Sequence, residues 1–339
     1  MKRIFQKVEA ALLRGEDVVL CSILASSGSA PRGAGAKMAV FADGTTIGTV
    51  GGGAVEQHTQ RLAMQVHESK QPVSHGFRLA PNQVNDIGMI CGGNVTVYFQ
   101  LLTAADLPFV QALITSLDSG ENVWLVLKLL DGAICETGLY DEKNGLRFTG
   151  CLTKAELQPM LKARAVYQKG EPGYYIEPIS RTGMVYIFGG GHVGKALVPE
   201  LARVGFRVTV FDNRPDFATK QTHPAAENVI FGDYYDIGKS VTITPEDYVV
   251  IMTPGHQADR EVLLQAMRTD ATYVGCIGSR HKIAATQRYL IDNGIPEETL
   301  PRIHAPIGLA IQAETPEEIA VSITAELILH RARHTQGEI

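Results

Sequence analysis

The sequence lacks the short cysteine and histidine patterns that build common metal sites and disulfide frameworks. Its five cysteines are odd in number, widely spaced and without a Cys-x-x-Cys pair, and its ten histidines form no His-Glu-x-x-His array. A disulfide-stapled domain or a zinc site of ordinary protein ligands is therefore poorly supported. The cysteines are Cys21, Cys91, Cys135, Cys151 and Cys276.

Positive charge and long apolar runs are also scarce. The net charge is -5, so the chain lacks the concentrated basic character of nucleic-acid-binding proteins, although a local anion site is compatible with it. No run of about 18 apolar residues is present, and acidic residues interrupt the apolar positions of the N-terminal segment, as they do not in a secretory signal. We therefore expect a cytoplasmic protein that binds neither nucleic acid nor membrane.

The length and composition predict a globular protein of more than one domain. The chain has 339 residues, of which 45% are hydrophobic and 20% charged, whereas a domain usually holds roughly 100 to 200 residues. Near residue 181 the pattern changes to a regular alternation of strand, glycine turn and helix. We expect an α/β domain over 1–180, whose middle segment 104–180 carries no evident chemistry, and a second domain over 181–339.

Hydrophobic patterning predicts an α/β fold in both parts. An amphipathic helix is expected at the N-terminus, and short apolar runs bounded by glycine predict strands over 18–24, 38–41 and 95–101. In the C-terminal part strands alternate with helices, which implies a Rossmann-like, doubly wound parallel sheet.

A glycine fingerprint opens the C-terminal part. Gly189, Gly191 and Gly194 fit G-x-G-x-x-G between a strand and the helix that begins near His192, which is the context of a dinucleotide-binding turn. Asp212 ends the next strand and could accept hydrogen bonds from ribose hydroxyls. The first and last glycines also serve helix–strand packing without a ligand, and Asp212 could merely cap a turn, so both interpretations stay open.

Two further strand ends carry cationic candidates. His256 lies in TPGHQADRE, and Arg280 and Lys282 lie in GSRHK. They could form an anion clamp at the crevice where the strand order reverses. Alternatively, His256 merely starts a helix, and Arg280 and Lys282 belong to a solvated first turn.

The N-terminal part combines two glycine turns with cations. Successive glycine amides followed by a helix can bind an anion, and the flexible segment SSGSAPRGAGAKMAV adds an arginine and a lysine. We expect a cradle for a phosphorylated ligand; the alternative is a set of strand-connecting turns with charged tips. The candidate residues are Arg32, Lys37, Gly51, Gly52, Gly53, Glu56, Gly92 and Gly93.

Cys91 precedes the second glycine pair, so a ligand could approach its sulfur without obstruction. A metal-binding or sulfur-relaying role requires a thiolate, and therefore a pKa lowered by nearby amides and by Arg32. The alternative is a small buried hydrophobic residue.

Several distinct motifs occur in one order along the chain. They are GSAPRGAGAKM, GTVGGGAVE, GMICGGNV, FGGGHVGKAL with FDNR, TPGHQADREVL, GCIGSRHK and APIGLAIQAETPEEIAVSITAEL. In this order they resemble the xanthine dehydrogenase accessory (XdhC/CoxI) family, and the similarity covers nearly the whole chain apart from roughly 102–180.

The resemblance implies an N-terminal XdhC/CoxI-type domain and a non-catalytic maturation factor for molybdenum hydroxylases. Such a factor binds the molybdenum cofactor, protects its sulfurated form supplied by a cysteine desulfurase, and helps to insert it into a xanthine- or aldehyde-oxidising apoenzyme. It also implies a homodimer and a soft metal ligand at Cys91. Relatives often have a cysteine where this chain has Ala54, and an acid and a glycine where it has Ala310 and Gln312.

Two other functions remain compatible with these motifs. The glycine fingerprint and Asp212 could serve an NAD(P)-dependent oxidoreductase. The same features could also belong to a redox or nucleotide sensor that regulates a partner.

Overall fold

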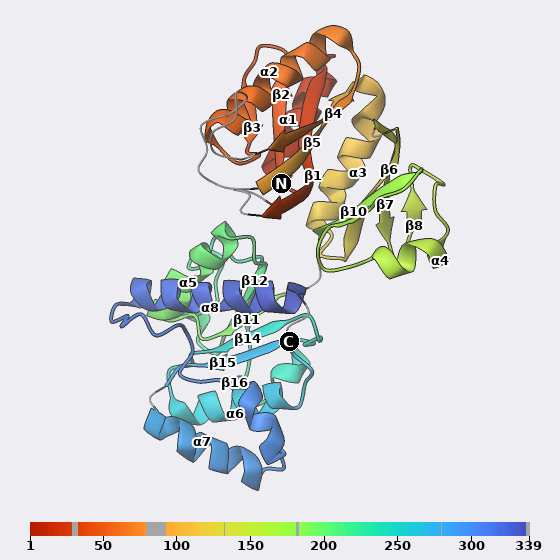
Figure 1. Cartoon of the computed structure of the whole chain (residues 1–339). Coiled ribbons are helices and arrows are strands. Elements are labelled where there is room, and N and C mark those ends of the chain that lie inside the picture. The colour runs from red at the N-terminus through yellow and green to blue at the C-terminus, as the bar shows by residue number, and fades with distance from the viewer. Residues whose placement is uncertain (29–32, 79–92, 132, 181–182, 279, 337–339) are drawn as a thin grey trace. The chain divides into compact units, whose positions relative to one another are not determined.

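The computed structural model describes residues 1–28, 33–78, 93–131, 133–180, 183–278 and 280–336 (Figure 1). The chain divides into two compact units, Met1–Arg181 and Thr182–Ile339. Two five-stranded sheets belong to the first unit and a six-stranded sheet belongs to the second.

The first sheet of the N-terminal unit is antiparallel and has the order β3-β2-β1-β5-β4. Alternating apolar residues of its central strands fill the interior on both faces. The strands are β1 (Val18–Gly28), β2 (Lys37–Phe41), β3 (Thr46–Gly48), β4 (Val73–Arg78) and β5 (Gly93–Leu102).

Three helices complete the packing around this sheet. Helix α2 (Gly53–Ser69) places Val55, Ala63 and Val66 on one face, against side chains of β1, β2 and β5. Helices α1 (Lys2–Leu13) and α3 (Leu107–Asp118) pack on the other face, and the core there continues into the second sheet.

The segment without evident chemistry forms that second sheet. Its order is β8-β7-β6-β10-β9, and all of its pairs are antiparallel. The strands are β6 (Val123–Leu130), β7 (Ala133–Asp141), β8 (Gly145–Arg147), β9 (Val166–Gln168) and β10 (Gly173–Ser180). The short helices α4 (Lys154–Leu157) and η2 (Gln158–Met160) contribute Leu157 and Met160 to a small separate core with β6, β7 and β10.

A buried ion pair joins the two sheets. The Lys37 ammonium on β2 lies 2.5 Å from a Glu177 carboxylate oxygen on β10, and the two side chains are 2% and 5% exposed. The Tyr175 hydroxyl donates to the same carboxylate at 3.1 Å. Burial, together with the charge of Glu177, raises the pKa of Tyr175, so this hydroxyl remains a neutral donor. Lys37 also reaches the carbonyl oxygen of Gly35 at 3.3 Å, which ties the end of the segment 33–36 to the pair.

The second unit is a parallel sheet with the order β13-β12-β11-β14-β15-β16. Numbered within the unit, this is the 3-2-1-4-5-6 order of a Rossmann sheet, as the alternating pattern predicted. The strands are β11 (Val185–Phe188), β12 (Val208–Asp212), β13 (Asn228–Phe231), β14 (Tyr248–Ile251), β15 (Tyr273–Cys276) and β16 (Ile303–His304).

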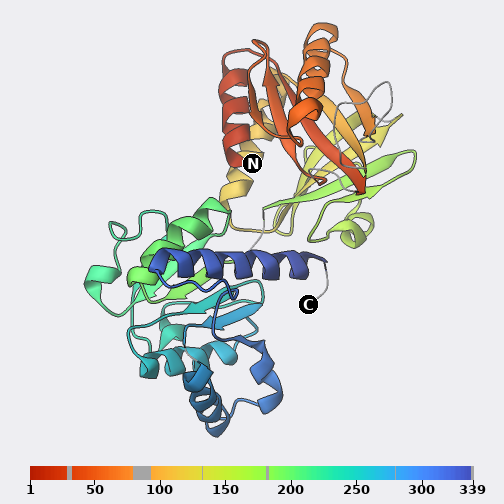
Figure 2. The ribbon, with the colours of Figure 1, turned by 60° about the vertical axis from the view of Figure 1, so that its left-hand side comes forward.

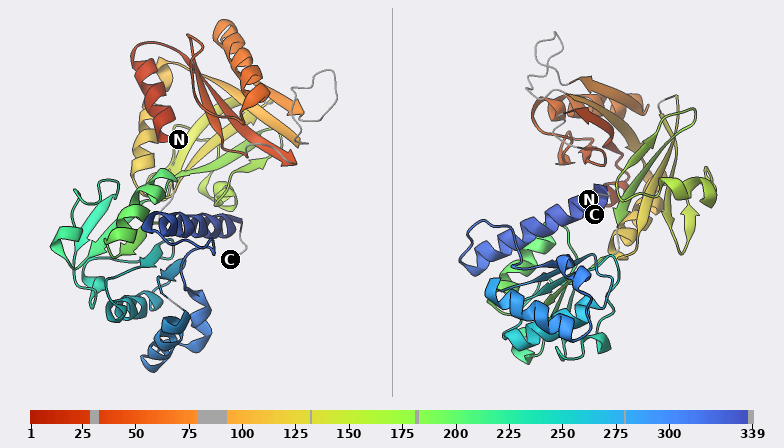
Figure 3. Two further views of the ribbon diagram at one scale, coloured as in Figure 1. Left: turned by 90° about the vertical axis from the view of Figure 1, so that its left-hand side faces the viewer. Right: turned by 60° about the horizontal axis from the view of Figure 1, so that its bottom comes forward.

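Helices cover both faces of this sheet (Figures 2 and 3). Helices α5 (His192–Arg203) and α8 (Pro316–Gln336) share one core with the sheet, and α6 (His256–Met267) shares the other with α7 (Arg280–Asp292). Short 3-10 turns complete the connections: η1 (Ala104–Asp106) in the first unit, and η3 (Pro215–Phe217), η4 (Ile237–Lys239) and η5 (Glu297–Arg302) in the second.

Packing accounts for part of the glycine fingerprint. A Cβ on Gly189 would lie 2.2 Å from the carbonyl oxygen of Met252, and one on Gly194 would lie 2.2 Å from the carbonyl oxygen of Gly189. Among the described residues, a Cβ on Gly191 would meet nothing closer than an Arg214 nitrogen at 3.9 Å. The fold therefore requires glycine at the outer two positions, whereas the middle position has room.

Breaking the buried ion pair should destabilise the first unit strongly. Lys37→Met leaves the Glu177 carboxylate buried without its cation, so we expect the free energy of unfolding in urea to fall by about 3 to 5 kcal/mol. The double variant K37M/E177L should recover most of that loss. Lys70→Met is the control, because its partner Asp17 forms an exposed pair, and it should cost less than about 1 kcal/mol. Equal effects of Lys37→Met and Lys70→Met would contradict this account.

The glycine positions should respond unequally to alanine. Gly194→Ala places a methyl group against backbone, so we expect a loss of about 1 to 3 kcal/mol in thermal unfolding. Gly191 has φ -69°, which alanine adopts easily, and Gly191→Ala should change stability by less than about 0.5 kcal/mol. A similar loss of stability in both variants would show that steric contact with a Cβ does not explain the need for glycine at positions 189 and 194.

Candidate functional site

The glycine-rich segments of the first unit leave its first sheet at one end. Gly28, which ends β1, pairs directly with Gly93, which opens β5. On the other side of β1, Lys37 begins β2, and its carbonyl oxygen accepts a 2.9 Å hydrogen bond from the Thr49 amide, just after β3 ends. Segments 29–36, 49–53 and 79–92 therefore leave the sheet toward the end at which β1 terminates, although Lys37 pairs with Ser22, six residues before Gly28 along β1.

The turn at Gly51, Gly52 and Gly53 has a backbone that only glycine adopts readily. Its φ angles are 138°, 79° and 55°. The Glu56 carboxylate accepts from the Gly52 amide at 3.0 Å and also from the Thr49 hydroxyl. Glu56 thus lies at the positive end of its own helix α2, where a bound anion would compete with it. Apart from the chain neighbours and the adjoining backbone of α2, no atom of the described residues lies within 4 Å of where a Cβ on Gly52 or Gly53 would be, so the described part of the unit leaves open space beside this backbone.

The other predicted residues of this unit have different surroundings. Lys37, expected to face a ligand, is instead buried in its ion pair with Glu177. Gly93 is described only through its backbone, which pairs with β1. Arg32, Cys91 and Gly92 lie outside the described residues.

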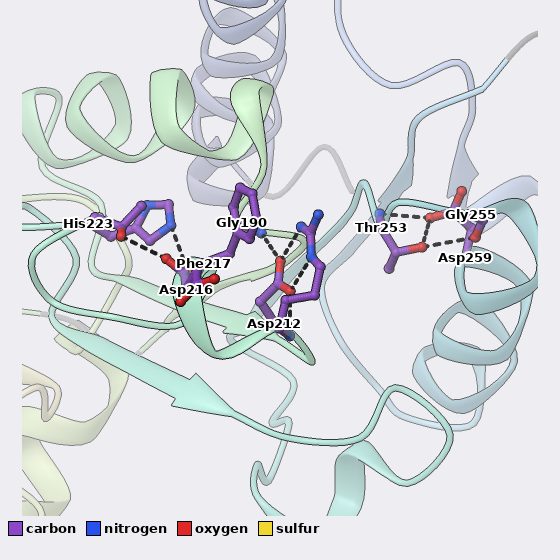
Figure 4. Close-up of polar contacts among 10 residues, drawn as sticks. Gly190, Asp212, Asp216, Phe217, His223, Thr253, Gly255 and Asp259 are labelled. Atoms are coloured by element: carbon purple, nitrogen blue, oxygen red, sulfur yellow. Dashed lines mark hydrogen bonds and ion pairs between the residues drawn. The ribbon is translucent and has the colours of Figure 1, made fainter.

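In the second unit, Asp212 is occupied by donors of the protein itself. One carboxylate oxygen accepts the Gly190 amide at 2.7 Å and the other accepts the Arg214 amide at 2.9 Å (Figure 4). The Arg214 side chain adds hydrogen bonds of 2.9 and 2.8 Å, and Asp212 is 0% exposed. Burial raises the pKa of Asp212, but the hydrogen bonds from Arg214 and Gly190 outweigh it and hold this pKa below its ordinary value. The carboxylate is ionised and holds the glycine turn.

A crevice of about 330 Å³ lies at the carboxyl ends of the central strands, next to the turn that Asp212 holds. Gly191, His192 and Gly194 line one side of it, and Arg214 and Thr253 line another. The Arg214 guanidinium stacks 3.9 Å above the centre of the Phe217 ring. The Thr253 amide and hydroxyl both donate to Asp259, at 2.8 and 2.7 Å. This is the switch point of the sheet, where ligands of open α/β folds bind.

His256 belongs to a different cavity. It begins α6 and, with Asp259 and Cys276, lines a small space of about 30 Å³ outside the crevice. Burial raises the pKa of the Cys276 thiol to about 12, so this sulfur is a protonated core group. Arg280 and Lys282 lie in α7, and their side chains are outside the described set.

Sequence reasoning missed two residues that organise these sites. Glu177 lies in the segment expected to carry no chemistry, and its own strand pattern gave no signal that it would face Lys37 from another sheet. Arg214 follows Asp212 by two residues in FDNR, so a side-chain pair could have been anticipated there.

Within the described ranges, no group of three or more His, Cys, Asp or Glu side chains is arranged to hold a metal ion. No helix among the described residues is long and apolar enough to cross a membrane.

Two protein-family models match the chain. The XdhC Rossmann domain matches residues 185–327, and the XdhC and CoxI family model matches residues 11–77. The first match covers the parallel sheet and its crevice, and the second covers the glycine turn at 51–53.

Curated relatives match along nearly the whole chain. A Bacillus subtilis protein described as a probable xanthine dehydrogenase subunit is 29% identical over 96% of this chain and 97% of its own length. The molybdenum cofactor insertion chaperone PaoD of Escherichia coli is 24% identical, over 94% of this chain and 84% of PaoD. The uncharacterized Escherichia coli protein YqeB is 26% identical over 94% of this chain, which spans only 45% of YqeB.

A solved structure shares the fold. The crystal structure of a xanthine dehydrogenase from Bacillus halodurans superimposes with a TM-score of 0.80 and 28% identity, over 97% of this chain and 96% of that one. The motifs, the family matches at both ends and this likeness agree: the chain belongs to the XdhC and CoxI family.

Proposed function

We propose that this chain is a maturation factor that binds the molybdenum cofactor as cargo and assists its insertion into a molybdenum hydroxylase. The observation that carries the proposal is that three glycine-rich segments leave the first sheet toward the same end. Family membership and the insertion-chaperone function named for PaoD support the same maturation role.

The proposal also covers how the cofactor arrives and where it goes. The chain accepts the sulfurated cofactor from a cysteine desulfurase, protects it, and passes it to a xanthine- or aldehyde-oxidising apoenzyme. It acts in the cytoplasm as a homodimer and performs no multiple-turnover chemistry. The name of the Bacillus subtilis relative is compatible with a xanthine dehydrogenase as the client.

We assign the cargo's phosphate to the turn at Gly52 and Gly53. The open space beside these glycines lets an oxyanion approach the backbone closely, and the N-terminus of α2 favours negative charge. The Glu56 carboxylate holds this turn before cargo arrives, and the cargo phosphate displaces it from the Gly52 amide on binding. Arg32 supplies the neutralising cation, since the Lys37 charge is already matched by Glu177.

We assign the soft ligand to Cys91, because molybdenum or its terminal sulfur calls for a thiolate. The support is positional: Gly93, two residues later, pairs with Gly28 at the end of β1. The described Cys21 is a poorer candidate, because it is buried among apolar side chains and burial raises its pKa. Lys37, buried beside Glu177, acts as a positioning residue for the segment that carries Arg32.

The crevice of the second unit does not favour an NAD(P)-dependent oxidoreductase. Ribose recognition in such enzymes uses a carboxylate at the end of the second strand. Both oxygens of Asp212 are instead committed to Gly190 and Arg214. We propose that Asp212 acts here as a structural anchor of the glycine turn.

Removal of the Cys91 thiol should release the cargo. Full-length protein produced in a molybdenum-replete host should copurify with molybdenum and with a pterin detected by its fluorescence after oxidation. Cys91→Ala should lower the content of both by at least about tenfold, because a metal–thiolate bond is lost. Cys135→Ala is the matched control, since Cys135 is an exposed cysteine of the second sheet, and it should leave the content unchanged. Cargo retained in full by Cys91→Ala would end the thiol assignment, and parent protein without molybdenum or pterin would end the proposal.

Nicotinamide nucleotides should bind weakly. Because the Asp212 acceptors are used within the protein, we expect no saturable NADH binding tighter than about 1 mM in a fluorescence titration. Micromolar binding that Gly191→Ala abolishes would instead restore the oxidoreductase hypothesis.

A further inference from the structure

A second hollow lies in the C-terminal unit, along α8 and next to the edge strand β16. We call it the α8 pocket; it has a volume of about 490 Å³. Its polar lining comprises Thr272, Arg302, His304, Glu326, His330 and Arg333. Its described lining residues and those of the crevice beside the glycine turn are different sets. The α8 pocket is therefore separate from the sites described above.

Glu326 on α8 organises the wall of this pocket. Its carboxylate accepts the Tyr273 hydroxyl at 2.9 Å, His304 Nδ1 at 2.9 Å and the Gly308 amide at 2.5 Å. Burial raises the pKa of Glu326, but the hydrogen bonds from His304, Gly308 and Tyr273 outweigh it and lower this pKa below its ordinary value. Three donors of the wall thus satisfy the oxygens of this carboxylate. Because Glu326 engages Nδ1, His304 can offer only Nε2 to a ligand, and its side chain is 34% exposed.

The remaining charge of the pocket is positive. Arg302 donates to the carbonyl oxygens of Thr269 and Ala271 at 3.0 and 3.2 Å, which fixes its guanidinium at the wall. Arg333 is an exposed residue near the end of α8 and lines the same hollow. Among the described residues that line the pocket, Glu326 is the one acidic side chain. Arginine pairs recognise planar oxyanions such as carboxylates and phosphates.

The pocket also has an apolar side. Leu309 and Leu329 line it and are 36% and 38% exposed, so their side chains have room for an apolar partner. The His304 ring stacks on Tyr273 with centroids 4.3 Å apart, and the His330 ring meets Tyr273 edge to face at 5.1 Å. Burial lowers the pKa of His330 to about 4, so this ring is neutral at pH 7 and adds to the aromatic wall.

We propose that the α8 pocket binds a small molecule that carries a carboxylate or a phosphate on an aromatic or apolar body. Arg333 and Arg302 take the oxyanion, and Leu309, Leu329 and the exposed part of His304 take the body. A volume of about 490 Å³ falls within the usual range of small-molecule sites. All the described residues that line the α8 pocket belong to the second unit, and none of them belongs to the turn assigned to the cargo phosphate.

The test measures ligand binding to the full-length protein by calorimetry and by ligand-observed NMR. The probes are AMP, benzoate, inorganic phosphate and the neutral nucleoside adenosine, each up to about 5 mM. We expect AMP or benzoate to bind with a Kd of about 1 mM or tighter, and whichever binds identifies the oxyanion as phosphate or carboxylate. Phosphate alone and adenosine should bind more weakly than the better of these two. Absence of binding by both AMP and benzoate would overturn the proposal, and so would adenosine binding as tightly as the better of these two.

Variants locate the binding. Arg333→Gln should weaken it by about tenfold, because a charge-assisted hydrogen bond is lost. Arg288→Gln on α7, also an exposed arginine, is the matched control and should have no effect. Gly191→Ala should also have no effect, since Gly191 belongs to the crevice. Equal affinities for Arg333→Gln and Arg288→Gln, or loss of binding in Gly191→Ala, would place the ligand elsewhere and overturn the assignment. Molybdenum and pterin content does not enter this test, so its failure and that of the proposed function are distinguishable.

Discussion

The buried pair between Lys37 and Glu177 is the interaction on which the first unit most depends. It joins two sheets whose strands are far apart in the sequence, and it holds the end of the glycine-rich segment that leads into β2. Both charges are removed from water, so neither can be lost without leaving the other uncompensated. The same pair neutralises the Lys37 ammonium inside the unit, so Lys37 is not available to a ligand near the glycine turns.

Buried or capping carboxylates have a common role in both units. Glu56 accepts from the turn before α2, Asp212 accepts from the turn before α5, and Glu326 accepts from the loop before α8. Each carboxylate satisfies a backbone amide that would otherwise need another partner. Carboxylates that look available to ligands in the sequence thus accept hydrogen bonds from loop amides and fix the conformation of those loops. The groups that we propose to face ligands are then the open backbone at Gly52 and Gly53, and the arginines of the α8 pocket.

Local patterns were sufficient for the fold class and for the C-terminal sheet, but they did not predict the second sheet of the first unit. The strand and helix periods of the C-terminal part, with glycines at a strand–helix turn, predicted its doubly wound sheet, and the structure confirms the Rossmann order. Segment 49–56 was predicted as a glycine turn that leads directly into a helix, and the positive φ angles of Gly51, Gly52 and Gly53 and the start of α2 at Gly53 agree with that. The roles of individual side chains were harder to predict. The function of Glu177 depends on a neighbour 140 residues away in sequence, and no local period reports such a neighbour.

The sequence by itself determined the fold class, the family resemblance and the places where the backbone must be glycine, because these depend on residue type, spacing and steric limits along the chain. Only the tertiary structure decided that Lys37 is paired, that Asp212 anchors a turn, and that Arg302, Arg333 and His304 line one hollow. The physical reason is that the availability of a charge depends on burial and on its nearest partners. Those partners are brought together by sheet register and helix packing, over separations that sequence periodicity does not encode.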